Sequence, residues 1–364
     1  MAKKLLCVVG TRPNFVKAAP LMRELNKYTN DFTTKLVHTG QHYDQNLSDW
    51  LFNDLGMAPP DISLGVGSGS HTQQTAKIML GIEEAVIAEK ADIIVVFGDV
   101  NSTLAAAVVA AKMGVKMAHV ESGLRSFDRT MPEEINRIVT DHLSDYLFVT
   151  EESGMRNLRH EGIADEKVFF TGNIMIDSLL ETIKVAERSE VLEQLGLQPQ
   201  GYALMTLHRP SNVDHPETLR YVLETIGQVA QRIPVVFPCH PRTQQNIARF
   251  GLEAATQQGN LMITEPLGYV DFCRLTHKCK FVLTDSGGIQ EETTYLQIPC
   301  ITMRENTERP ITVDVGTNVM TGNDRAKILQ TVAAILDGAP KRGRIPELWD
   351  GHAAKRIVEI LRKV

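Results

Sequence analysis

The chain has 364 residues and carries 38 Lys and Arg against 44 Asp and Glu, a formal net charge of −6. It has no basic block or tail, which argues against nucleic acid or an anionic membrane as a partner. Any anionic ligand must therefore be bound by a local site. The length exceeds what one hydrophobic core usually serves and predicts two domains.

The chain begins with a short apolar run, "LLCVVG", that leads directly into "GTRPNF". This run has no cleavage site after it and is far shorter than the roughly 20 apolar residues of a membrane span. We therefore predict that it is the first strand. The five cysteines are scattered, lie mostly within apolar runs and form no C-x-x-C pair, which favours reduced core thiols and a cytoplasmic protein. They are Cys7, Cys239, Cys273, Cys279 and Cys300.

Short apolar runs alternate with stretches of helical periodicity, first in "KLLCVVGT", "TKLVHTGQ", "DIIVVFGDV", "VKMAHVES", "DYLFVTEE" and "KVFFTGN". A second series follows a helix-like stretch at 177–196 and comprises "YALMTLHRP", "IPVVFPCHP", "NLMITEP", "KFVLTDSGG" and "PCITMRE". This alternation is typical of parallel sheets covered by helices. We expect an α/β protein with two doubly wound Rossmann-like domains facing a cleft, residues 1–173 and 174–351, with a terminal helix at 352–364 packing back on the first domain.

Ligands of open parallel sheets bind beyond the carboxyl ends of the strands. In the first domain these positions, with the "PEEINR" segment that follows them, supply Arg12, Lys17, Gln41, His42, Asp99, Glu121, Glu133, Glu134 and Arg137. In the second domain they supply His208, Arg209, His240, Ser286, Gly287 and Gly288. Surface charge is the simpler interpretation of Lys17 taken by itself.

Glu121, in "HVESGLRS", stands where a buried strand should end in apolar residues. It is either a solvated carboxylate at a loop edge or an acid or base at a cleft. Asp99, Glu121 and Glu133 at the ends of one sheet would repel one another unless a function or a shared proton holds them there. This cluster favours the functional interpretation.

The segment "TDSGGIQEE" combines a strand, a turn of small residues and a helix start. Its amides at Gly287 and Gly288 and the Ser286 hydroxyl suit a phosphate, and Glu292 suits a diol such as a ribose. The alternative is a tight turn in which Asp285 or Ser286 caps the helix. "GVGSGS" at 65–70 matches a dinucleotide fingerprint poorly, and we expect a loop. No D-x-D or H-x-x-x-H motif or cysteine cluster suggests a metal site.

Taken together, the stretches "GTRPNFVKAAP", "TGQH", "FGDVNST", "HVESGLRS", "PEEINR", "HRP", "TDSGGIQEE" and "RENTERP" resemble the non-hydrolysing UDP-N-acetylglucosamine 2-epimerases. The resemblance implies a glycosyltransferase-B-like fold, no metal or nicotinamide cofactor, and a homodimer. "GTRPNF" replaces the commoner "GTRPEA", and "HRPSNVD" replaces an "HRRES"-like run.

The resemblance further implies reversible C2 epimerisation of UDP-GlcNAc to UDP-ManNAc. Elimination of UDP gives 2-acetamidoglucal, and UDP then adds back. Asp99, Glu121 and Glu133 match the acid/base positions, and His208 assists the departing UDP. The residues implied to bind the substrate are Arg12, Lys17, Arg137, His208, Ser286, Gly287, Gly288 and Arg309, with Glu292 at the ribose and Leu267 to Tyr269 at the uracil.

Several alternatives stay open at this point. Within enzymes they are a hydrolysing epimerase that releases ManNAc and an epimerase of a related N-acetylated UDP-sugar. A glycosyltransferase would share the fold but has no use for three acids, and a non-catalytic regulator would tolerate their loss. In some relatives a second, activating UDP-GlcNAc binds at positions matching Gln41, His42, Glu134, Arg209 and His240. The alternative for these five is structural support of Glu133 and His208.

Overall fold

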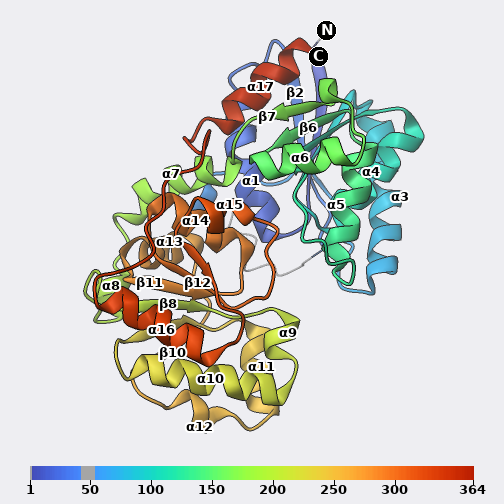
Figure 1. Ribbon diagram of the computed structural model, residues 1–364. Helices are drawn as coiled ribbons and strands as arrows, with labels where there is room; N and C mark the ends of the chain where they lie inside the picture. Colours follow the sequence, from blue (N-terminus) through green and yellow to red (C-terminus); the bar gives the residue numbers. More distant parts are fainter. Residues whose placement is uncertain (1, 42–53) are drawn as a thin grey trace. The chain divides into compact units, whose positions relative to one another are not determined.

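The computed structural model describes residues 2–41 and 54–364. Contacts divide the chain into two compact units, Met1–Leu180 with Glu347–Val364, and Glu181–Pro346. Each unit is a parallel α/β fold (Figure 1). Within the described ranges, no helix combines the length and apolar character needed to span a membrane.

The first unit contains a sheet of order β3-β2-β1-β4-β5-β6-β7. Its strands are β1 (Lys3–Val9), β2 (Phe32–His38), β3 (Ile62–Ser63), β4 (Ile93–Phe97), β5 (Lys116–Ser122), β6 (Tyr146–Val149) and β7 (Val168–Phe170). The helices are α1 (Arg12–Leu25), α3 (His71–Glu89), α4 (Asn101–Met113), α5 (Pro132–Leu143), α6 (Glu152–His160) and α17 (Ala353–Lys363), with a 3-10 turn η1 (Asp165–Lys167); α7 (Ile174–Ala186) leads into the second unit.

The second unit contains a sheet of order β10-β9-β8-β11-β12-β13. Its strands are β8 (Ala203–Thr206), β9 (Val235–Pro238), β10 (Leu261–Thr264), β11 (Phe281–Thr284), β12 (Cys300–Thr302) and β13 (Asn318–Met320). The helices are α8 (Val191–Gln194), α9 (Pro210–Val213), α10 (Pro216–Ala230), α11 (Pro241–Arg249), α12 (Glu253–Thr256), α13 (Tyr269–Lys278), α14 (Gly287–Leu296), α15 (Pro310–Asp314) and α16 (Arg325–Leu336).

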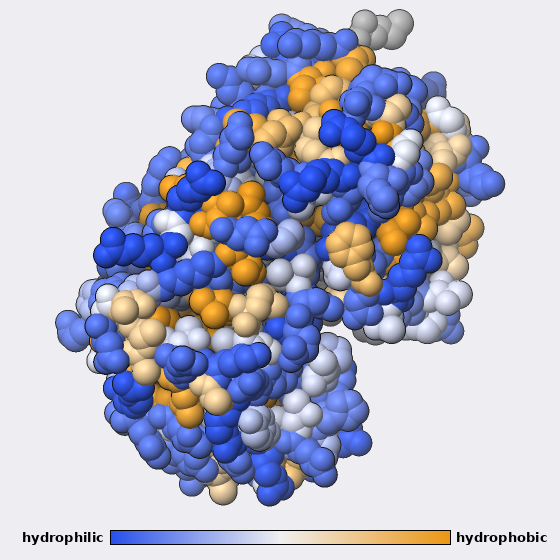
Figure 2. Space-filling model, in the orientation of Figure 1, coloured by the Kyte–Doolittle hydropathy of each residue, from blue (hydrophilic) through white to orange (hydrophobic). Residues whose placement is uncertain are grey.

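The central strands are apolar on both sides because helices cover both faces of each sheet. Ala203 and Met205 of β8 pack into one hydrophobic cluster, whereas Leu204, between them, packs into the cluster on the opposite face. This is the alternation of side chains along a strand. All five cysteines are buried, which confirms their predicted core placement. On the face shown in Figure 2, small hydrophobic patches lie among hydrophilic residues.

The strand orders fix where a ligand site belongs in each unit. The chain winds outward from β1 through β2 to β3, then returns to β4 on the other side of β1. In the second unit it does the same from β8 through β9 to β10, then β11. Connections diverge beyond the carboxyl ends of β1 and β4, and of β8 and β11, and these switch points are where such folds bind ligands.

Candidate active site

The three predicted acids follow neighbouring elements of the first unit. Asp99 lies two residues after β4, Glu121 lies near the end of β5, and Glu133 lies in the first turn of α5. Glu121 has a φ of 73°, in the left-handed region, which costs a non-glycine residue roughly 1–2 kcal/mol. A bulky residue held in this region beside a switch point indicates a functional constraint.

Glu121 forms a buried ion pair with Lys17 of α1. Lys17 is 5% exposed, so its interpretation as a surface charge is wrong. A Cβ added to Gly98 would lie 3.0 Å from the Lys17 ammonium and 3.8 Å from Glu121 Oε1, so the glycine leaves room for this pair beside Asp99. Nearby, Asn14 donates to the Phe97 carbonyl (2.8 Å) and accepts from the Gly10 and Thr11 amides, so it ties α1 to the ends of β1 and β4.

Arg137 connects Asp99 with the loop before α5. Its Nε and Nη2 lie 3.0 and 2.7 Å from Asp99 Oδ2, and its Nη1 pairs with Glu134. Glu134 also accepts from the Ser126 and Phe127 amides at 2.9 and 2.8 Å. Arg137 therefore anchors Asp99 to the loop that leads from β5 into α5.

Glu133 is half-buried, as Asp99 is, and differs from the other two acids because it has no cationic partner among the described residues. Arg12, the first residue of α1, is also half-buried and follows β1 at the switch point.

The residues predicted for a second nucleotide site contribute to local structure. Gln41 Oε1 accepts from the Ser102 hydroxyl at 2.8 Å and from its amide at 3.2 Å. Glu134 binds the loop as described above, and the His240 ring accepts from the Arg242 amide at the start of α11 (3.2 Å). Arg209 Nη2 lies 3.8 Å from Glu308 Oε1. His42 lies outside the described residues.

In the second unit, Asp285 positions the loop after β8. It is fully buried and accepts from the amides of His208 (3.0 Å) and Arg209 (2.8 Å) and from the Asn212 side chain (3.1 Å). Burial favours its protonated form, but the hydrogen bond and charge of His208, whose Nδ1 is 3.1 Å away, and the amide bonds outweigh this and lower its pKa. The contact with Asp285 therefore fixes the orientation of the His208 side chain, which is 39% exposed.

The turn after β11 is built to exclude side chains. Ser286 is the N-cap residue of α14, yet its side chain makes no capping bond. A Cβ on Gly287 would lie 2.6 Å from Glu308 Oε1 and 2.7 Å from Arg309 Nη1, so a side chain at this position would displace this pair. Arg309 Nε also lies 2.9 Å from Glu291 Oε1. A helix N-terminus and a positioned guanidinium thus occur together, as a phosphate site requires.

Glu292 lies further along α14, where it is buried and accepts a hydrogen bond from the Tyr269 hydroxyl at 3.0 Å. Tyr269 is the first residue of α13, and Leu267 precedes it by two residues. The structure therefore connects the expected ribose residue with the expected uracil segment.

The sequence analysis did not identify three residues as contributors to this region: Asp285, Arg304 and Glu308. Asp285 was weighed only as a helix cap, but it binds a loop 76 residues earlier in the chain. Glu308 links Arg309 with Arg304, whose Nη2 is 2.8 Å away. The "RENTERP" pattern, in which two arginines enclose two glutamates, was the available signal. Within the described ranges, no cluster of three or more His, Cys, Asp or Glu is arranged to hold a metal ion.

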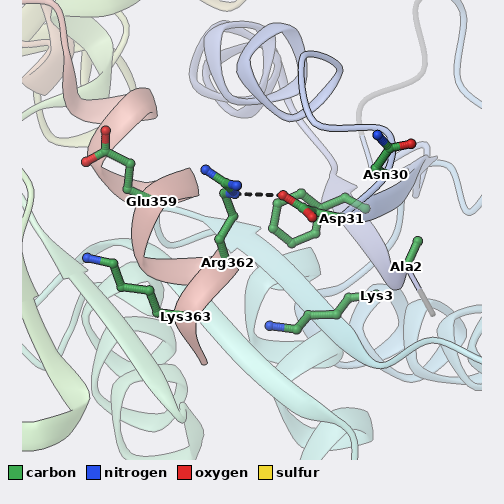
Figure 3. Close-up of a pocket in the computed structure, with 8 residues that line it drawn as sticks. Ala2, Lys3, Asn30, Asp31, Glu359, Arg362 and Lys363 are labelled. Atoms are coloured by element: carbon green, nitrogen blue, oxygen red, sulfur yellow. Dashed lines mark hydrogen bonds and ion pairs between the residues drawn. The ribbon is translucent and has the colours of Figure 1, made fainter.

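A pocket of about 810 Å³ lies elsewhere, at the amino ends of β1 and β2 beside α17 (Figure 3). Lys3, Asp31 and Arg362 line it, and the Arg362–Asp31 ion pair of 2.7 Å crosses it. It lies at the amino ends of the strands, whereas the three acids follow their carboxyl ends, so it is not part of the candidate active site.

Comparison with known proteins identifies the family of the chain. A family model described as UDP-N-acetylglucosamine 2-epimerase matches residues 23–362. The UDP-N-acetylglucosamine 2-epimerase of Methanocaldococcus jannaschii is 41% identical over 364 residues, 98% of each chain. The UDP-2,3-diacetamido-2,3-dideoxy-D-glucuronate 2-epimerase of Pseudomonas aeruginosa is 38% identical over 365 residues, 99% of this chain and 100% of that one.

A crystal structure of the M. jannaschii UDP-GlcNAc 2-epimerase in complex with UDP-GlcNAc and UDP superimposes with a TM-score of 0.92 at 41% identity, covering 99% of this chain and 100% of that one. The two doubly wound units have the glycosyltransferase-B-like architecture of these epimerases. The chain belongs to the UDP-N-acetylglucosamine 2-epimerase family.

Proposed function

We propose that the protein interconverts UDP-GlcNAc and UDP-ManNAc without hydrolysis. The observation that carries this proposal is the set of three acids at one end of the first sheet, of which two are paired with cations and the third has no cation among the described residues. A C2 epimerase must remove a proton from one face of the sugar and return one to the other, so a single group does not suffice.

The reaction consists of one elimination and its reversal. A carboxylate takes the C2 proton, the C1–C2 double bond forms, and the C1–O electron pair leaves with UDP to give 2-acetamidoglucal. In the reverse sense UDP attacks C1 while C2 receives a proton on the opposite face. No oxidant, water or other reactant is consumed, so the products are UDP-sugars alone.

The ion pairs suggest how the acids divide this work. Glu121 is paired with Lys17 and Asp99 with Arg137, and we assign these two carboxylates the role of base. We assign the delivery of a proton to Glu133, which has no cationic partner among the described residues. Arg309, the α14 amides and His208 would stabilise the charge that develops on UDP as the C1–O bond breaks. We further propose that Arg12 contacts the same diphosphate, that Glu292 binds the ribose, and that Leu267 to Tyr269 bind the uracil.

Proton NMR of the product mixture tests the proposal against the hydrolysing alternative. Starting from either UDP-sugar, we expect the same final mixture of UDP-GlcNAc and UDP-ManNAc. Accumulation of free ManNAc with UDP would instead show hydrolysis.

The P. aeruginosa relative supports a second candidate substrate, a UDP-sugar with two acetamido groups and a carboxylate. The two substrates are distinguished by kcat/KM measured side by side. We expect UDP-GlcNAc to be preferred, and a higher kcat/KM for the diacetamido-glucuronate would assign the chain to the second activity.

For the five residues predicted to bind an activating nucleotide, the contacts of Gln41, Glu134 and His240 support a structural role. We propose that these three support the local fold. With UDP-ManNAc as the only substrate, progress curves should then start without a lag. A lag abolished by a trace of UDP-GlcNAc would show that a second site operates.

A further inference from the structure

One fully buried carboxylate, that of Asp141 on α5, organises the loop around Glu121. Its Oδ1 lies 2.7 Å from His119 Nδ1, and its Oδ2 accepts from the Gly123 amide at 3.0 Å and lies 2.7 Å from Arg125 Nη1. Three residues on both sides of Glu121 therefore converge on one side chain.

This convergence accounts for the backbone at Glu121. The β5–β6 register shifts between Val120 and Ser122, and Glu121 between them has a φ of 73°. A strained conformation persists only where surrounding contacts impose it. Here the contacts of Asp141 to residues 119, 123 and 125 do so.

His119 also links this loop to the neighbouring acid. Its Nε2 lies 2.8 Å from the carbonyl oxygen of Gly98, the residue before Asp99. The Gly98 amide in turn donates to the Val120 carbonyl at 3.0 Å. The ends of β4 and β5, which carry Asp99 and Glu121, are thus joined through one histidine ring.

The partners of His119 define its charge. A carbonyl oxygen and an ionised carboxylate only accept hydrogen bonds, so both ring nitrogens must carry a proton. Asp141 is in turn ionised, because it accepts on its other oxygen from an amide and from Arg125. Arg125 then binds Glu161 through two bonds of 2.8 and 2.7 Å, so the charges along these four residues alternate in sign and sum to zero.

The pKa of Asp141 agrees with this arrangement. Burial favours the protonated carboxyl, but the charges and hydrogen bonds of His119 and Arg125 outweigh burial and lower the pKa.

We propose that His119 is a positioning residue, held as a buried imidazolium between Asp141 and the Gly98 carbonyl, that sets the backbone of Asp99 and Glu121 for proton transfer. The effect on turnover rests on the proposed epimerase function, whereas the charge state of the ring does not. A purely structural histidine would affect stability and leave the turnover of folded protein unchanged.

The charge state is measured on the wild-type protein by ¹⁵N NMR with labelled histidine, His119 being identified by the signal lost in His119→Gln. We expect a proton on each of the two His119 ring nitrogens, because both face acceptors. The comparison signal is that of His142, whose side chain is 44% exposed and whose Nδ1 lies 3.9 Å from Glu161 at the other end of the network. A neutral His119 ring at pH 8 would overturn the proposal.

The positioning effect is measured with His119→Gln, which retains donor and acceptor groups but no charge, against His142→Gln. Displacing reacting groups by about 1 Å can lower turnover roughly 10²-fold. We expect a kcat loss approaching this size in His119→Gln, with KM and UDP affinity within about twofold, and normal kcat in His142→Gln.

Equal kcat in the two folded variants would contradict the positioning role. If His119→Gln does not fold, the His119 ring signals are assigned in the wild-type protein by triple-resonance NMR, and they still decide the charge state on which the proposal depends. If the wild-type protein turns over no UDP-sugar, the proposed function fails, while the NMR measurement stands separately.

Discussion

At the scale of single residues, the three acids differ in their partners. Glu121 is paired with Lys17 and Asp99 with Arg137, whereas Glu133 has no cation among the described residues. Each is expected to act on the sugar, while the diphosphate is expected to bind residues of the second unit. Loss of an acid should therefore affect the chemical step more than nucleotide binding.

We predict that Asp99→Asn, Glu121→Gln and Glu133→Gln each lower kcat by ~10²–10⁴-fold, the usual contribution of a general acid or base. The Kd for UDP, measured by calorimetry, should stay within a few-fold of the wild-type value. Near-normal turnover of any one variant would remove that residue from the mechanism.

Gly287→Ala tests the phosphate site, because the added Cβ would lie 2.7 Å from Arg309 Nη1 and 2.6 Å from Glu308 Oε1. Displacing this pair should weaken UDP binding by roughly tenfold or more, the equivalent of a lost charge-assisted hydrogen bond. Gly69→Ala is the control, since its Cβ would meet its nearest neighbour at 3.4 Å. Equal UDP affinity of the two variants would argue against Arg309 as a phosphate ligand.

The sequence indicated which residues stand at strand ends but not what they contact. From the sequence, Lys17 by itself was interpreted as a surface charge, because its burial depends on Glu121, which lies 104 positions later in the chain. Asp285 was interpreted as a helix cap. Its contacts with the loop after β8 depend on the pairing of β8 with β11, which the local sequence does not reveal. Hydrogen bonds between distant segments decide both cases.

At the scale of elements, the strands predicted from apolar runs are present, and the terminal helix is confirmed as α17. β3 and β13 were missed, because the polar residues Ser63 and Asn318 leave no continuous apolar run in either short strand. The stretch at 177–196 was expected to be helical throughout, but α7 ends at Ala186 and the short α8 begins at Val191. The spacing of apolar residues in this stretch did not indicate the break between the two helices.

Asp177 of α7 caps α17 and makes stability depend on pH. It accepts from the Ala353 and Ala354 amides at 3.2 and 2.9 Å. Burial outweighs these bonds and raises its pKa from 3.8 to about 6. The folded chain thus binds this proton more tightly than the unfolded chain, so the ionised carboxylate destabilises the fold above pH 6 and this penalty is relieved as pH falls toward 3.8.

Asp177→Asn removes this titration. We predict that the free energy of unfolding of the wild type, relative to the variant, rises between pH 7 and pH 4 by on the order of 3 kcal/mol. Urea unfolding followed by tryptophan fluorescence measures it. A difference that is constant with pH, or that falls in acid, would show that Asp177 does not have a raised pKa.

At the scale of the whole molecule, Leu80 and Ile87 of α3 are each 63% exposed and lie seven residues apart, on one face of the helix. We propose that a homodimer covers this face. Sedimentation velocity should give a dimer for the wild type and a monomer for Leu80→Glu with Ile87→Glu, while Val185→Glu, at a site 52% exposed on α7, should remain dimeric. A monomeric wild type, or a dimer that survives both changes on α3, would place this prediction in error.

The central claim is that the acids of the first unit move a proton at C2 of a UDP-sugar, and proton NMR of UDP-GlcNAc with the enzyme in deuterium oxide tests it most directly. An abstracted proton exchanges with solvent, and the proton returned to the other face comes from a group that has itself exchanged. We therefore expect deuterium at C2 of both UDP-GlcNAc and UDP-ManNAc as the two equilibrate. Epimerisation with protium retained at C2 would contradict the account.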